Sequence, residues 1–182
     1  GEKPGIIPDE EWKRKSYDQP WQGGDTINAA IGQGYVLSTP LQLAVMTAGL
    51  VNGGNLLRPR LLQEEKIERI GVDPAHLNAI RAGMEAAVNL PHGTALGSRI
   101  ADPDFLMGGK TGTAQVRKIT IRGQNQNTIP WNQRHHALFI AYAPVENPRY
   151  VCAVVVEHGG GGASAAAPVA RDLLLKTREL IG

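Results

Sequence analysis

The chain has 182 residues with 42% hydrophobic content, which is the size and composition of one globular domain with a buried core. Its 19 basic and 17 acidic residues leave a formal charge of +2, a balance that argues against nucleic acid as a partner. Because no run of about 18 apolar residues is present, we expect no signal peptide or membrane span within this sequence.

The N-terminal part predicts an extended segment. Residues 1–26 are rich in Gly, Pro and Trp, carry mixed charge and lack apolar periodicity. Such a composition is typical of loops that pack onto another part of a protein. We therefore expect residues 1–26 to form a loop-like segment without a core of its own.

The following residues, 27–100, predict a helical part. One helix should open at Thr39-Pro40, with the threonine as its cap and the proline at its first position. The Asn-Gly-Gly sequence at 52–54 should end it. A second helix should start at Asp73-Pro74, because apolar residues follow at helical spacing, and it should stop between 89 and 93.

The last part, residues 101–182, predicts a sheet and a closing helix. Runs at 110–116, 136–143 and 150–157 predict strands, and their connections favour antiparallel pairing. Pro168 should open the closing helix, whose apolar residues are expected on or near one face. These residues are Val169, Leu173, Leu174, Thr177, Leu180 and Ile181. The order of helices, then three strands, then a closing helix predicts an α/β layered structure. Because three strands and one covering helix make a small sheet for a chain of this length, we expect the chain to be part of a larger domain.

Several reactive side chains have ordinary structural explanations. Cys152, the single cysteine, stands in an apolar β-branched run, so we expect a small buried residue and neither a nucleophile nor a metal ligand. His135 and His136 have no further ligand at a metal-binding spacing, so we expect strand-edge histidines and no metal site. The glycines at 159–162 lack a following Lys and Ser or Thr, so they predict a strand-to-helix turn rather than a phosphate loop. Trp131 has two open interpretations, the mouth of a substrate groove and packing over the core.

The sharpest local signal is the sequence Gly-Gly-Lys-Thr-Gly-Thr-Ala at 108–114. Alternation along a strand puts Thr111 and Thr113 on one face. Gly112 leaves room for a ligand backbone alongside, and Lys110 supplies a positive charge for a carboxylate. The stretch from Phe105 to Val145 contains bases and no acid, which indicates either a site for an anionic group or a solvated basic loop. Its bases are Lys110, Arg117, Lys118, Arg122 and Arg134.

The sequence resembles a known family over nearly its whole length. Lys-Thr-Gly is one of three elements of the penicillin-recognising serine transferases and hydrolases, together with Ser-x-x-Lys and Ser-x-Asn or Ser-Asp-Asn. Five segments resemble the elongation-type penicillin-binding protein 2 family, in the family's order. They are WQGGDTI at 21–27, IGQGYVLSTPLQL at 31–43, GGKTGTAQV at 108–116, HALFIAYAP at 136–144 and HGGGG at 158–162.

The resemblance implies a partial penicillin-recognising serine transferase fold, an antiparallel sheet flanked by helices. This chain would be the C-terminal portion of a single transpeptidase domain, with the last three strands, two or three helices and the C-terminal helix. The parent would be periplasmic, anchored in the bacterial inner membrane by an N-terminal helix that this sequence does not include. It would work with a glycosyltransferase of the cell-elongation machinery.

The resemblance also implies an activity, peptidoglycan D,D-transpeptidation. Such an enzyme attacks the D-Ala-D-Ala end of a stem peptide, forms an acyl-serine and passes the acyl group to a neighbouring strand, with β-lactams as suicide substrates. Lys110 would complete the polar network behind the nucleophile and attract the substrate carboxylate, which Thr111 and Thr113 would bind alongside Gly112. The Thr113 backbone N–H would be one of two oxyanion donors. No cofactor is implied.

The nucleophile that this family requires is missing from the sequence. None of the serines is followed by Lys three residues later or by Asn two residues later; they are Ser16, Ser38, Ser98 and Ser164. In the family both missing motifs precede the segment that matches 1–26, so we expect an N-terminal truncation and no acyl-enzyme. An unpaired sheet edge should then cause self-association.

Two rival functions are weighed against the transpeptidase. A serine β-lactamase shares Lys-Thr-Gly on a strand, but the flanking segments argue against it. A non-catalytic module that binds cell-wall peptide or scaffolds partner synthases is the alternative from a different class. A full-length gene starting near Gly1 would support that alternative.

Overall fold

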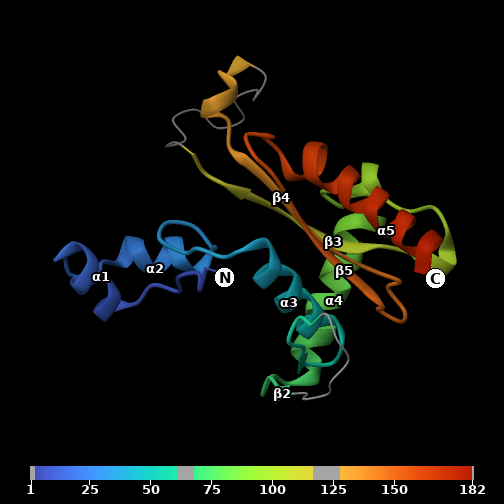
Figure 1. The fold of residues 1–182 in the computed structure, drawn as a ribbon, viewed down its shortest axis with the longest axis horizontal. Helices are drawn as coiled ribbons and strands as arrows, with labels where there is room; N and C mark the ends of the chain where they lie inside the picture. Colours follow the sequence, from blue (N-terminus) through green and yellow to red (C-terminus); the bar gives the residue numbers. More distant parts are fainter. Residues whose placement is uncertain (1–2, 61–67, 117–127, 182) are drawn as a thin grey trace. The chain divides into compact units, whose positions relative to one another are not determined.

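The computed structural model describes residues 3–60, 68–116 and 128–181 (Figure 1). The chain divides into two compact units, Gly1–Thr39 and Pro40–Gly182, and each is described by itself. This division differs from the expected boundary between residues 26 and 27, because helix α2 (Gly23–Ala30) runs through that position. In the described ranges, no helix has both the length and the apolar character needed to cross a membrane.

The prediction of an extended segment at residues 1–26 is wrong, because helix α1 (Glu10–Tyr17) lies within it. The carboxylate of Asp9 caps this helix by accepting a hydrogen bond from the Trp12 backbone N–H at 2.7 Å. The first turn of α1 carries acidic residues and the last turn basic ones, an order that complements the helix dipole. Apolar periodicity failed to reveal α1 because the residue it buries is a lysine, Lys13.

The first unit is held together by polar and aromatic contacts. Lys13 is buried and forms an ion pair with Asp25 of α2. The rings of Trp12, Tyr17 and Tyr35 pack together, with centroid distances between 5.0 and 5.6 Å. None of the buried hydrophobic side chains in the described residues lies in this unit. This agrees with the expectation that the N-terminal segment lacks a hydrophobic core of its own.

The second unit contains the antiparallel sheet that the sequence predicts. Its strands are β3 (Gly108–Ala114), β4 (His136–Ala143) and β5 (Tyr150–Val156), in the order β3-β4-β5. The expected runs match β4 in full and β3 and β5 to within two residues at each end. β4 is therefore the central strand, while β3 and β5 each have an outer edge with no strand paired to it in the described ranges.

Helices cover both faces of this sheet (Figure 1). Odd-numbered residues of β4, such as Phe139, pack in a core cluster with α5 (Ala167–Ile181). On the even-numbered side, Tyr142 packs with Val51 of α3 (Pro40–Val51) and Met84 of α4 (Pro74–Asn89). The layered α/β architecture thus agrees with the prediction.

The helix boundaries of the second unit follow the predicted signals. The Asp73 carboxylate accepts a hydrogen bond from the Ala75 backbone N–H at 2.8 Å and caps α4. Gly53 and Gly54, at φ angles of 83° and 89°, turn the chain after α3, in a conformation that favours glycine. A two-stranded sheet of β1 (Asn55–Leu56) and β2 (Glu68–Arg69), which the sequence does not predict, follows this turn.

Of the apolar residues expected on or near one face of helix α5, only Leu174 is fully buried. It begins at Ala167, one residue before the predicted start, after a π-helical turn, η5 (Gly162–Ala166). Its buried residues are Ala167, Ala170 and Leu174. Four of the apolar residues expected on the packing face are exposed: Val169, Leu173, Leu180 and Ile181. Ala167 and Ala170 are small and pack against the sheet together with Leu174, so this face sets the rotation of the helix.

Candidate functional site

The predicted site lies on β3, at an outer edge of the sheet. Lys110 and Thr113 are exposed there, and Thr111 and Gly112 are partly buried. Their partners across the ladder run from Ile140 for Lys110 to Ala137 for Thr113. The structure therefore brings all four predicted site residues together on one short strand that faces solvent.

Two glycines allow β3 to occupy this position. A Cβ atom added to Gly108 would stand 2.5 Å from the Tyr142 ring, and one added to Gly109 would stand 2.5 Å from the Phe139 ring. Both aromatic side chains are fully buried. Any larger residue at either glycine would collide with them, so this pair lets β3 lie against the aromatic core and presents the following lysine at the surface.

The Lys110 ammonium group bends back along the free edge of β3. Its Nζ donates to the Thr111 carbonyl oxygen at 3.0 Å and lies 3.4 Å from the Thr111 hydroxyl oxygen. We infer that the Thr111 carbonyl points away from β4, toward the free edge. Because the N–H and C=O groups of an antiparallel strand alternate in direction, the backbone groups of Thr113 point the same way.

A third hydroxyl joins this edge from the loop after α4. Thr94 Oγ1 lies 3.5 Å from Thr111 Oγ1. Gly93 makes this approach possible, because a Cβ there would stand 2.5 Å from the Ala87 carbonyl oxygen. Sequence reasoning missed Thr94, since it lies 17 residues before Thr111 and only the close return of this loop onto α4 brings the two together.

A cavity of about 310 Å³ lies between Lys110 and α4. Its walls are mainly apolar, with Ala86, Ala87 and Leu90 on one side and the lysine at its rim. A Cβ on Gly112 would meet Leu138 Cβ at 3.2 Å, a tight contact that favours glycine at this position. The cavity beside Lys110 therefore offers the space next to β3 that a small ligand needs.

The charge around this edge is positive. Among the described residues no carboxylate forms an ion pair with Lys110. Arg117, Lys118 and Arg122, which belong to the basic stretch, lie outside the described residues. An ammonium group that has only hydroxyl and carbonyl partners retains its capacity to attract an anion.

The glycines at 159–162 form the predicted strand-to-helix turn, and the last of them contacts the backbone of the site strand. A Cβ on Gly162 would stand 2.5 Å from the Leu138 carbonyl oxygen and 2.9 Å from the Gly112 carbonyl oxygen. The start of η5 thus lies directly on the backbone of β3 and β4. This contact supports β3 where Gly112 pairs with Leu138 of β4.

Histidines connect this turn to the strands. His135 Nδ1 accepts from the Val116 backbone N–H at 3.1 Å, and His136 Nδ1 accepts from the His158 backbone N–H at 2.9 Å. These contacts agree with the expected strand-edge positions. In the described part of the chain no group of three or more His, Cys, Asp or Glu could hold a metal ion. His158, which the sequence did not single out, packs its ring 4.6 Å from those of His136 and Trp131.

Two further predictions concern side chains away from β3. Trp131 is 61% exposed and lies against His158, so it does not pack over the core. Cys152 is partly buried, and desolvation raises the pKa of its thiol to about 11. The thiolate form of Cys152 is therefore disfavoured, in keeping with the expected structural role.

Comparisons with known proteins identify the family. Residues 1–175 match the model of the penicillin binding protein transpeptidase domain. The peptidoglycan D,D-transpeptidase MrdA of Haemophilus influenzae is 40% identical over 185 residues, covering 92% of this chain and 28% of the relative. The MrdA protein of Escherichia coli K12 is 34% identical over 173 residues, covering 87% of this chain and 27% of the relative. The chain thus spans less than a third of the length of these relatives.

Solved structures agree with this relationship. A complex between penicillin-binding protein 2 and MreC from Helicobacter pylori matches at a TM-score of 0.86 and 33% identity, covering 100% of this chain and 32% of that one. Pseudomonas aeruginosa penicillin-binding protein 2 in complex with WCK 5153 matches at 0.79 and 35%, covering 100% and 39%. The chain belongs to the transpeptidase-domain family of penicillin-binding proteins, in which it is closely related to penicillin-binding protein 2.

Proposed function

We propose that this chain supplies the carboxylate-binding strand of a peptidoglycan D,D-transpeptidase. The observation that carries the proposal is the arrangement on β3, where the Lys110 ammonium lies 3.0 Å from the Thr111 carbonyl oxygen and has no acidic partner in the described residues. The C-terminal carboxylate of a stem peptide ending in D-Ala-D-Ala would replace these weak contacts with charge-assisted hydrogen bonds.

Each site residue has a separate role in this proposal. Lys110 attracts the carboxylate, and the hydroxyls of Thr111 and Thr113 donate hydrogen bonds to it. Gly112 leaves the strand open so that the peptide can lie alongside. The Thr113 backbone N–H, directed toward the free edge, stabilises the oxyanion that forms when a serine attacks the scissile carbonyl.

The attacking serine belongs to another part of the parent protein in this proposal. Ser98 is buried, and the Ser164 hydroxyl donates to the Gly161 carbonyl oxygen at 3.2 Å. Neither is followed by the Lys or Asn that the family motifs require. The parent would act in the periplasm, anchored in the inner membrane, with β-lactams as inhibitors and a glycosyltransferase as its partner.

The carboxylate role can be tested with the chain itself. We expect an N-acetylated peptide ending in D-Ala-D-Ala to shift the amide NMR signals of Thr111, Gly112 and Thr113. Lys110→Ala should weaken binding at least about tenfold, whereas Lys110→Arg should retain most of it, because the charged hydrogen bond is worth more than a neutral one. A C-terminally amidated peptide is the control. Equal binding of the amidated peptide would contradict the carboxylate role.

The origin of the nucleophile needs a second measurement. We expect the intact mass of the chain to be unchanged after incubation with excess benzylpenicillin. A stable adduct on a serine would mean that the chain carries its own catalytic machinery. Rapid hydrolysis of the drug without an adduct would favour the β-lactamase alternative. The full reading frame distinguishes a transpeptidase parent from a non-catalytic cell-wall-binding module.

A further inference from the structure

The turn between β5 and η5 holds one residue in an unusual backbone conformation. His158 has a φ angle of 54°, and in the described ranges Asp18 is the only other residue besides glycines with a positive φ. Such a conformation is disfavoured for residues with a side chain and persists where surrounding contacts hold it. Three contacts tie this turn to residues 134–136, where β4 begins.

Two of these contacts use backbone oxygens, and the third uses a side chain. The Arg134 carbonyl oxygen accepts from His158 Nδ1 at 3.0 Å. The His135 carbonyl oxygen accepts from the Gly160 backbone N–H at 2.8 Å. In the third contact, His136 Nδ1 accepts from the His158 backbone N–H at 2.9 Å. Only a neutral imidazole with its proton on Nε2 can accept at that position.

His135 makes a contact of the same kind with another segment. Its Nδ1 accepts from the backbone N–H of Val116, two residues beyond the end of β3, at 3.1 Å. The His135 side chain is 6% exposed. Two consecutive imidazoles thus fasten the chain leaving β3 and the turn before η5. A protonated imidazole has no acceptor atom, so both contacts are lost when these rings take up a proton.

The rings of His136 and His158 respond differently to acid. Their centroids are 4.6 Å apart, and the Trp131 ring lies 4.6 Å from His158 on another side. His158 can take up a proton at Nε2 and still donate from Nδ1 to the Arg134 carbonyl oxygen. His136 cannot take up a proton at Nδ1 without losing its contact. A charge on His158 would also repel one on His136, so acid disfavours the present arrangement.

The elements around His136 bring few other charges to it. β3 places Ala114 opposite His136 in the ladder, and η5 contains no charged residue. Among the described residues, no carboxylate forms an ion pair with His136 or His158. A positive charge on the His136 ring therefore has no ion-pair partner there to offset its lost hydrogen bond. The titratable or charged side chains near these two histidines in the chain are Arg134, His135 and Glu157.

We infer that His136 is a positioning residue for the site on β3, through which acid loosens that site. The turn that His136 holds leads to Gly162, where a Cβ would stand 2.9 Å from the Gly112 carbonyl oxygen. Neutral His136 keeps the turn fastened against β3, and protonation releases the His158 N–H. His135 adds the same dependence at the end of β3. Imidazoles change charge between about pH 5 and 8. The effect on ligand binding rests on the proposed function, whereas the loosening of the turn does not.

Amide NMR of the chain without peptide tests the loosening of the turn. Between about pH 7.5 and about pH 5.5, the signals of His158, Gly162 and Gly112 should move toward a second state. His136→Asn has a side-chain oxygen in place of Nδ1 and does not titrate, so its His158 and Gly162 signals should stay in the first state. His136→Ala lacks an acceptor and should show the second state already at the higher pH.

A matched control removes an imidazole elsewhere. His76 is exposed in the first turn of α4, so His76→Asn should respond to pH as the unmodified chain does. The inference is overturned if His136→Ala retains the first-state signal of Gly162, or if that signal in His136→Asn still moves with pH. Should His136→Ala fail to fold, the comparison between the unmodified chain and His136→Asn decides, since asparagine keeps the acceptor.

Peptide titration at the same two pH values tests the link to the site. The carboxylate of an N-acetylated peptide ending in D-Ala-D-Ala stays ionised over this range. The unmodified chain should bind it about threefold to tenfold more weakly at the lower pH, the worth of about one hydrogen bond. The double variant His135→Asn and His136→Asn should bind equally at both. His92 lines the cavity beside Lys110, but its protonation would strengthen anion binding in acid, which is the opposite sign.

The two measurements separate the inference from the proposed function. An absence of binding at either pH would contradict the proposed function alone, because the signals of the turn are recorded without peptide. Equal binding by the unmodified chain at both pH values, with the turn signals changed, would overturn the positioning role of His136.

Discussion

The two outer edges of the β3-β4-β5 sheet have opposite chemistry. β3 carries glycines, threonines and an exposed lysine, whereas β5 carries apolar and mostly β-branched residues. The same backbone hydrogen-bonding groups are presented at both edges. The side chains therefore give the two edges a different character: the polar and cationic β3 edge suits the small anionic ligand proposed above, whereas the β5 edge is apolar.

The elements behind the edges differ in a corresponding way. Behind β3, the start of η5 approaches so closely that Gly162 has no room for a Cβ atom. Beside β5, α5 leaves a groove, and Leu173 is 49% exposed at its side. One edge is rigidly supported by backbone contacts, while the other is bordered by apolar surface that is still available for burial.

The largest expected effect is on stability, and it should differ between the adjacent leucines Leu173 and Leu174 of α5. Leu174→Ala should lower the free energy of unfolding by about 3 kcal/mol, because its side chain is 2% exposed in the main core cluster. Leu173→Ala should change it by less than about 0.5 kcal/mol when the chain is monomeric. Urea denaturation at low chain concentration measures both.

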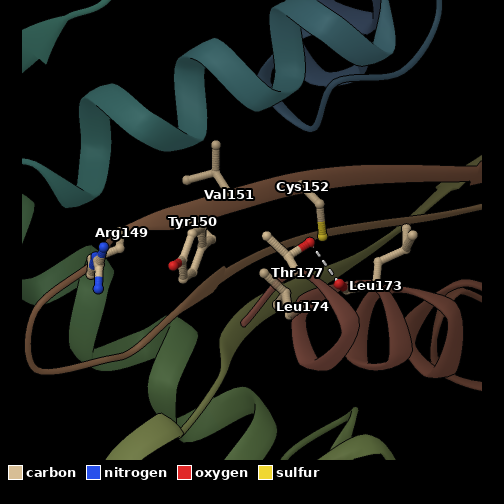
Figure 2. Close-up of a pocket in the computed structure, with 7 residues that line it drawn as sticks. All are labelled: Arg149, Tyr150, Val151, Cys152, Leu173, Leu174 and Thr177. Carbon is tan, nitrogen blue, oxygen red and sulfur yellow. Dashed lines mark hydrogen bonds between the residues drawn. The ribbon is translucent and has the colours of Figure 1, made fainter. Parts of the chain in front are cut away.

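The same pair shows whether the apolar side chains beside the groove between β5 and α5 (Figure 2) belong to the core. Equal losses of stability in the two variants would mean that Leu173 packs in the core as Leu174 does.

The next effect concerns the support of β3. Gly162→Ala should cost about 2 kcal/mol, because the new Cβ would collide with backbone oxygens of Leu138 and Gly112, which cannot rotate away. Gly97→Ala is the matched control, since nothing lies within 4 Å of a Cβ there. Its stability should be unchanged or slightly higher, owing to the loss of unfolded-state entropy. Urea denaturation of both variants gives the comparison, and a neutral Gly162→Ala would show that η5 does not support the strand.

Sequence patterns predicted the strands well and the packing between elements poorly. β4 was predicted at its observed bounds because its apolar run is continuous, and α4 because Asp73-Pro74 is a strong start signal. Helix α1 was missed because Lys13 and Asp25, rather than an apolar stripe, hold it. The buried face of α5 was misjudged because neighbouring leucines fit either rotation.

The candidate site was predictable only where it is local. Lys110, Thr111, Gly112 and Thr113 are consecutive, so a strand pattern suffices to group them. Thr94 and Gly162, in contrast, reach β3 from loops that are distant in sequence. Their approach is possible because Gly93 and Gly162 have no side chain. Hydrophobic periodicity does not predict such close backbone contacts.

The smallest expected effect concerns an ion pair between α5 and the turn that precedes β3. Arg178, near the end of α5, donates a hydrogen bond to Asp102, which caps the turn shortly before β3. The hydrogen bond from Arg178, followed by that from the Asp104 backbone N–H, lowers the pKa of Asp102 below its ordinary value of 3.8. A lowered carboxyl pKa means that the folded state favours the ionised form. Its contribution to stability is therefore present above pH 3.8 and is lost as the pH falls through the folded-state pKa.

Thermal unfolding at pH 7 and pH 3 measures this contribution. Asp102→Asn should lower Tm at pH 7 by no more than about 2 °C, because the pair is partly exposed and screened by solvent. The variant should then lose less stability than the unmodified chain on acidification. Asp104→Asn is the matched control, since its carboxylate accepts no hydrogen bond from the described residues. If both variants respond to acid as the unmodified chain does, the ion pair between Arg178 and Asp102 does not stabilise the packing of α5 against the turn before β3.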